Sequence, residues 1–192
     1  MDAAVLLSNR IMLLEKLDPR QRAWVEVKPS AIEANTLKIK NFIPKDCLLM
    51  AVVKADGYGH GAGTVAKAAL KGGAEILGVA TLQEGIDLRV SDISCPILLL
   101  GNLIDKEEFD SCIDWDLMPT ISSTREVELC KALVEERHQT ISVHLKVDTG
   151  MTRLGCEFTD VDFLIEMIAN CKLIELKGIY SHLALADGDF DG

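Results

Sequence analysis

The sequence lacks the features of a membrane, secreted or nucleic-acid-binding protein. No apolar run approaches the roughly 20 residues of a membrane-spanning helix, and the first residues, MDAAVLLSNR, carry neither a basic segment nor a signal-cleavage pattern. The formal net charge of −10 is dispersed rather than clustered, which disfavours nucleic-acid binding. We therefore expect a cytoplasmic protein that binds neither membranes nor nucleic acids.

Metal-binding and disulfide patterns are also missing. The sequence contains no CxxC pair and no HExxH motif, and its four histidines are scattered, so we expect no metal site. Free thiols that pack as small apolar groups are the best account of the six widely spaced cysteines, which are Cys47, Cys95, Cys112, Cys130, Cys156 and Cys171.

What is present is a repeated alternation of apolar strands and helices. The expected strands are 24–27, 48–53, 76–80, 97–100, 117–121, 141–147 and 176–183, with helices over 2–17 and from about 30, 64, 81, 105, 123 and 159. Capping boxes are expected at Ser30 with Glu33 and at Thr81 with Glu84, and Asp105 with Glu108 starts another helix. This α/β pattern predicts parallel βαβ units in a barrel or a doubly wound sheet.

The stretch LLMAVVKADGYGHGAG, residues 48–63, combines a buried-type strand with a glycine-rich loop. Lys54 follows the strand, where an amine is placed to attack a carbonyl group, although a lysine that reaches into solvent is the simpler alternative. The glycines match neither GxGxxG nor GxxxxGK[ST], which excludes the Rossmann and P-loop fingerprints. A different phosphate cradle stays open, formed by backbone, the Tyr58 hydroxyl and the next helix N-terminus.

Polar residues lie at the ends of most of the expected strands. They are Lys54, Thr81, Asn102, Ser122, Lys146, Asp148 and His182. Because the carboxyl ends of parallel strands share one face, these residues together favour a functional site there. Taken singly, several have ordinary roles as helix caps or turn formers.

A second dense stretch, HLKVDTGMTRLG, ends another strand. Lys146, Asp148 and Arg153 fall within eight residues around a glycine turn, and a guanidinium binds a carboxylate or phenolate through two hydrogen bonds. A surface salt-bridge cluster is the alternative. A lysine beside a phosphate cradle suggests a Schiff base with pyridoxal phosphate, whereas a barrel aldolase would use the lysine directly on its substrate.

Three motifs in order, AVVKADGYGHG, HLKVDTGMTRLG and GIYSHLALAD, resemble those of the alanine racemase family. The resemblance implies a (β/α)₈ barrel with a C-terminal β domain, pyridoxal 5'-phosphate as cofactor, a homodimer, and interconversion of L- and D-alanine for peptidoglycan. It also implies that residues 24–27 belong to the second domain's sheet. For this chain it predicts a partial TIM-type barrel of about six strands over 24–192, after a helical extension over 1–23.

The resemblance also implies roles for individual residues. Lys54 matches the Schiff-base lysine and catalytic base, and Tyr58 a tyrosine that contacts the cofactor phosphate. Arg153 matches an arginine near the cofactor's phenolic oxygen and the substrate carboxylate, and Lys146 a lysine, carbamylated in some members, that holds this arginine. His182 matches a histidine that supports the arginine facing the pyridine nitrogen.

The chain departs from the family pattern at Lys28 and Ser181, and it ends before the segments that carry the second base, a tyrosine. We therefore expect a fragment with little or no racemase activity by itself. The alternatives are a racemase of another amino acid, such as serine or a broad range, and a non-catalytic remnant that binds pyridoxal phosphate.

Overall fold

The computed structural model describes residues 23–185, so the helix expected over 2–17 lies outside the described part. The strands are β1 (Met50–Val52), β2 (Ile76–Val79), β3 (Ile97–Asn102), β4 (Met118–Ile121), β5 (Ile141–Val147) and β6 (Ile174–Ser181). The helices are α2 (Pro29–Phe42), α3 (Lys54–Gly59), α4 (Ala62–Lys71), α5 (Leu82–Val90), α6 (Lys106–Asp114), α7 (Thr124–Arg137) and α8 (Val161–Ala169), with a 3₁₀ turn at Phe158–Asp160.

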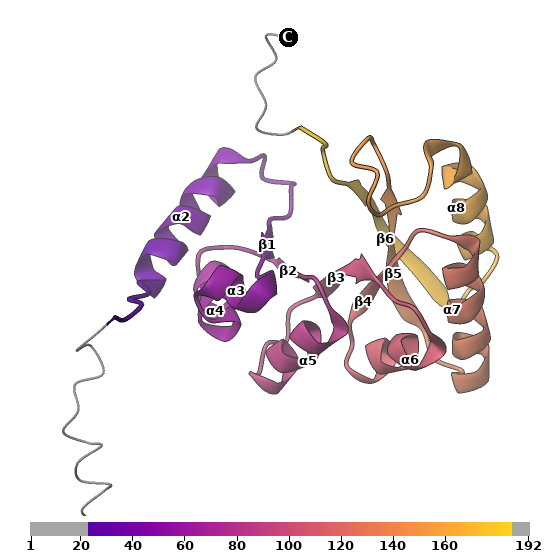
Figure 1. The fold of residues 1–192 in the computed structure, drawn as a ribbon, viewed down its shortest axis with the longest axis horizontal. Coiled ribbons are helices and arrows are strands. Elements are labelled where there is room, and N and C mark those ends of the chain that lie inside the picture. Colours follow the sequence, from indigo (N-terminus) through magenta and orange to yellow (C-terminus); the bar gives the residue numbers. More distant parts are fainter. Residues whose placement is uncertain (1–22, 186–192) are drawn as a thin grey trace, which may run out of the picture.

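The six strands form one parallel sheet in the order of the sequence, from β1 to β6. A doubly wound sheet reverses its strand order at a switch point, whereas a barrel adds each strand next to the preceding one. The strand order therefore indicates a barrel and not a doubly wound sheet. Figure 1 shows the helices in an arc outside the curved sheet, which remains open between β1 and β6. The prediction of a partial six-stranded barrel is confirmed.

The core lies between the sheet and these outer helices. On β5, Ile141, Val143 and Leu145 are buried in the core, while the alternate residues Ser142 and His144 line a cavity at the N-terminal ends of the strands. All six cysteines are free, and four of them are buried, as the sequence predicts. Burial raises the pKa of the Cys112 thiol to about 12, which makes it a packing group rather than a nucleophile.

Most of the predicted helix starts are observed, but the capping box expected at Ser30 with Glu33 is not formed. Thr81 and Glu84 form the complete capping box of α5, and the side chain of Asp105 accepts from the third helical N–H of α6. Helix α2 instead begins at Pro29, with Lys28 as its N-cap and no side-chain cap. The fixed φ of proline suits the first helical position, so Ser30 already lies within the first turn.

Two strand predictions also need correction. Residues 24–27 form no strand, because no neighbouring strand within residues 23–185 pairs with them. The first barrel strand covers only Met50–Val52 and is not buried on both faces: Val52 is 38% exposed. As the edge of the sheet, β1 pairs with β2 alone and lines an open cleft.

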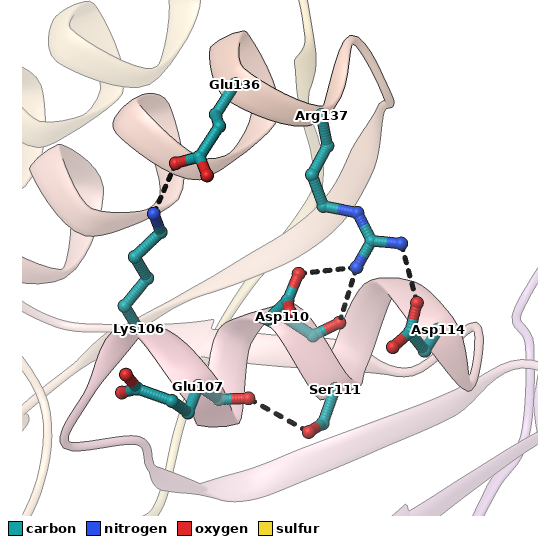
Figure 2. A network of polar contacts seen from close by, with 7 residues as sticks. All are labelled: Lys106, Glu107, Asp110, Ser111, Asp114, Glu136 and Arg137. Carbon is teal, nitrogen blue, oxygen red and sulfur yellow. Dashed lines mark hydrogen bonds and ion pairs between the residues drawn. The ribbon is translucent and has the colours of Figure 1, made fainter.

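Charged side chains join α6 to α7 on the outer surface (Figure 2). Arg137 pairs with Asp110 and, at 2.6 Å, with Asp114, while Lys106 pairs with Glu136. These groups are partly exposed, so each pair contributes little to the free energy of unfolding. Among residues 23–185, no helix is long and apolar enough to cross a bilayer.

Candidate active site

A cleft of about 510 Å³ opens at the C-terminal ends of the strands. Three cationic side chains reach it from different elements: Lys54 after β1, Lys146 on β5, and Arg153 in the loop after β5. The side chain of His182, which follows β6, lines the same cleft. No aspartate or glutamate is among the residues that line it, so the cleft suits an anionic ligand.

Lys54 begins an unusual turn. The four residues Ala55 to Tyr58 have left-handed backbone angles, with φ between 51° and 61°. Such a conformation costs about 1–2 kcal/mol for each residue that carries a Cβ atom. Gly57 avoids this cost, and a Cβ at its position would also lie 2.8 Å from a methyl group of Val65. The glycines predicted to form a loop thus form a tight left-handed turn directly after the lysine.

Several hydrogen bonds hold this turn in place. The N–H of Ala55 donates to Oε1 of Glu84 at 2.8 Å, and the N–H of Gly57 donates to the Val53 carbonyl at 2.9 Å. Oδ1 of Asp56 accepts from the N–H of Ala62 at 2.7 Å and so joins the turn to α4. The direction in which the chain leaves Lys54 is therefore set by Val53, directly after β1, and by groups on α4 and α5.

Lys146 is a buried cation without a carboxylate partner among the ion pairs of the described residues. Only 6% of its surface is exposed, and Nζ donates to the Leu100 carbonyl at 3.2 Å. The same Nζ lies 5.4 Å from the centre of the Tyr180 ring. Burial lowers the pKa of Lys146, and the positive charges of Arg153 and Lys54 lower it further. A neutral amine is thus favoured more than at an exposed lysine.

Tyr180 is a cleft residue that the sequence analysis did not select. It pairs with Lys146 across β5 and β6, and its hydroxyl lies 2.7 Å from Oγ1 of Thr120, which itself donates to the Leu99 carbonyl. Burial raises the pKa of Tyr180, while the hydrogen bond with Thr120 acts in the opposite direction. Its position two residues before His182, within the strand expected over 176–183, was the available signal.

Asp148 supports the loop that carries Arg153. Its Oδ1 accepts from the N–H groups of Gly150 at 2.9 Å and Thr152 at 3.0 Å, and these bonds lower the pKa of the Asp148 carboxyl. The Asp148 carboxylate thus binds backbone N–H groups and holds the turn before Arg153. Of the three residues predicted for this rim, Lys146 and Arg153 line the cleft, whereas Asp148 is not among the lining residues.

Other predicted residues do not line the cleft. The Tyr58 side chain is 59% exposed and lies on the turn after Lys54. Thr81 caps α5, which is its ordinary role. Asn102 donates to the Ser122 hydroxyl and, at 2.8 Å, to Oε1 of the buried Glu126. Residues 23–185 contain no group of three or more histidine, cysteine or acidic side chains arranged to hold a metal ion.

Pyridoxal phosphate carries an aldehyde, a phenolic oxygen and a phosphate, and the cleft offers matching groups. Lys54 supplies an amine for the aldehyde, and the other two cations, Lys146 and Arg153, supply positive charge for its anionic oxygens. The volume is within the usual range for small-molecule sites. The residues present therefore fit this cofactor.

Comparison with known proteins agrees with this geometry. The family model described as "Alanine racemase, N-terminal domain" matches residues 27–191. The alanine racemase of Prochlorococcus marinus is 61% identical over 186 residues, which are 97% of this chain and 48% of that protein. The alanine racemase of a Synechocystis species is 43% identical over 168 residues, covering 88% of this chain and 45% of that protein.

Solved structures show the same architecture. Alanine racemase from Bacillus anthracis with bound L-Ala-P superposes with a TM-score of 0.78 and 36% identity, over 85% of this chain and 42% of that one. Alanine racemase from E. faecalis superposes with a TM-score of 0.75 and 36% identity, over 82% of this chain and 43% of that one. The chain spans about half the length of the curated relatives it matches.

Proposed function

Because this chain belongs to the family of alanine racemase N-terminal domains, we propose that it binds pyridoxal 5'-phosphate and takes part in the interconversion of L- and D-alanine. The observation that carries the proposal is the convergence of Lys54, Lys146 and Arg153 on one cleft at the C-terminal ends of the barrel strands. Three cations without a lining carboxylate suit an anionic cofactor, and one of them is an amine at the rim.

Pyridoxal phosphate, when bound, withdraws electrons from the α carbon of an amino acid and so acidifies its proton. In this proposal the Lys54 amine would hold the cofactor and would remove or return the proton at the α carbon of the amino acid. Arg153 binds a cofactor oxygen or the substrate carboxylate through its planar guanidinium. By the family resemblance, His182 would support a group that faces the pyridine ring, and the exposed Tyr58 phenol would contact the phosphate.

Lys146 has a separate role. It is buried beside two cations, and a protonated amine there would repel Arg153. The favoured neutral amine removes this repulsion. It can also add carbon dioxide and release a proton, which gives a carbamate that binds the guanidinium of Arg153, as the family resemblance suggests.

Further parts of the proposal follow the resemblance. We assign residues 24–192 to a cofactor-binding domain of a cytoplasmic homodimer that supplies D-alanine for peptidoglycan. Lys54 is the one base that we assign, and a tyrosine serves as the second base in the family. Low racemase activity of this chain alone therefore remains a prediction.

Reduction with borohydride tests the proposal. Borohydride reduces the carbon–nitrogen bond between a lysine and pyridoxal phosphate to a stable link, which peptide mass spectrometry then locates. We expect one cofactor per chain, attached at Lys54. Substitution Lys54→Ala should abolish this attachment, and Lys67→Ala, at an exposed position on α4, should leave it unchanged.

Three results would contradict the proposal. The first is wild-type stoichiometry of attachment in Lys54→Ala. The second is attachment spread over surface lysines in the wild-type chain. The third is trapping of a keto substrate without pyridoxal phosphate, which would indicate a lysine aldolase. The change in cofactor absorbance on addition of alanine, compared with the change on addition of serine, then reports which amino acid the chain prefers.

A further inference from the structure

Three successive helices begin with the same local device. In α5, α6 and α7 the third helical residue is a glutamate whose carboxylate folds back onto a backbone N–H just before the helix. Glu108 accepts from Ile104 at 2.6 Å, and Glu126 accepts from Ser122 at 2.6 Å. Glu84 accepts through Oε2 from Ala80 at 2.7 Å and from Thr81 at 3.3 Å. Each glutamate thus caps its own helix.

Glu84 differs from Glu108 in the use of its second oxygen. Oε1 of Glu84 accepts from the N–H of Ala55 at 2.8 Å. Ala55 lies 29 positions before Glu84 in the chain and directly after Lys54. Both oxygens of Glu84 are therefore engaged by backbone donors of two different strand ends. For Glu108, the backbone donor at the strand end is bound by Oε2 alone.

Ala55 is the first residue of the left-handed turn, and alanine gains nothing from this conformation by itself. The bond from Gly57 to the Val53 carbonyl spans Lys54 without binding its peptide groups, and the bonds from Gly61 and Ala62 to Asp56 act on later residues. The Glu84 carboxylate acts on the peptide group that joins Lys54 to Ala55. It therefore controls the backbone orientation from which the Lys54 side chain leaves.

We propose that Glu84 is a positioning residue for Lys54: its carboxylate links the end of β2 to the turn after β1 and aims the lysine amine into the cleft. This inference rests on the proposed function, since it concerns the bond between Lys54 and pyridoxal phosphate. Glu84 itself is not among the residues that line the cleft.

The substitution Glu84→Gln tests the link with little change of shape. A glutamine has one acceptor oxygen, so its NH₂ group must face the N–H of either Ala55 or Ala80, and one of the two bonds is lost. The matched control is Glu108→Gln, whose amide oxygen can keep the bond to Ile104 while the NH₂ group replaces the other oxygen. Both variants remove one negative charge at the third position of a helix.

Two measurements are made on the 192-residue chain. Amide hydrogen exchange, without cofactor, should become about tenfold faster for residues 55–58 in Glu84→Gln only, because a bond to a charged acceptor is lost. The rate of borohydride-trappable attachment at saturating pyridoxal phosphate should fall about tenfold, whereas the half-saturating concentration should stay within about twofold. A group that holds the amine affects the bond-forming step more than the binding of the phosphate.

Equal attachment rates and equal exchange in the two variants would overturn the inference. Loss of the folded state in Glu84→Gln while Glu108→Gln stays folded, measured by circular dichroism, would also overturn it, because Glu84 would then support the whole fold. Glu84→Asp, whose shorter side chain cannot span both partners, should give the same local effects as Glu84→Gln. If the wild-type chain attaches no cofactor at Lys54, the proposed function fails, while the exchange measurement still decides whether Glu84 holds the turn.

Discussion

Two arginines at the ends of helices allow a sharp test of how buried and exposed hydrogen bonds contribute to the free energy of unfolding. Arg89 and Arg137 both lie in the last turn of their helices, α5 and α7. Arg137 pairs with two carboxylates on the outer surface (Figure 2). The Arg89 side chain is only 11% exposed, and it donates to the backbone carbonyls of four residues, namely Ile93, Cys95, Trp115 and Asp116, at 2.5–2.9 Å.

The substitution of each arginine by lysine keeps the charge and the helix propensity but removes the planar fork. A lysine at position 89 reaches at most two of the four carbonyls. Loss of the other two costs about 3 kcal/mol of the free energy of unfolding, taking about 1.5 kcal/mol for each bond to a charged donor. A lysine at position 137 keeps one exposed ion pair, so its cost should stay below about 0.5 kcal/mol.

Urea unfolding followed by circular dichroism measures both values, at low salt and in 1 M sodium chloride. The small effect at Arg137 should disappear at high salt, where the Debye length is about 3 Å, while the effect at Arg89 should persist. Equal losses for the two variants would refute the reasoning, as would a loss below about 1 kcal/mol for Arg89→Lys. Either result would mean that the four carbonyls find equivalent partners in water.

Two further predictions concern the site. Because burial and two neighbouring cations lower the pKa of Lys146, the unfolded chain binds this proton more tightly. The free energy of unfolding should therefore rise with pH until the pH reaches the ordinary pKa of a lysine. Lys146→Met should remove this part of the slope in urea titrations at several pH values; an unchanged slope would contradict it. Gly57→Ala should lower the free energy of unfolding by about 2 kcal/mol or more, through the left-handed backbone and a methyl overlap, whereas Gly59→Ala, with open space around it, should cost about 1 kcal/mol. Equal costs would show that the overlap relaxes freely.

The sequence by itself determined the alternation of strands and helices, most of their boundaries, and the end of the sheet that carries Lys54, Lys146 and Arg153. These features depend on local periodicity, on caps such as Thr81, and on the rule that parallel strands share one carboxyl face. The three motifs also identified the family, which the comparisons confirm.

Only the tertiary structure decided which partners those residues meet. It showed that β1 is an exposed edge, that Tyr180 lies against Lys146, and that Glu84 uses its second oxygen on the turn after Lys54. It also separated Arg89 from Arg137, two residues with the same place in their helices. Such contacts join residues that lie 23 to 34 positions apart in the chain. They depend on how the sheet curves and how each helix packs on it, which local sequence patterns do not encode.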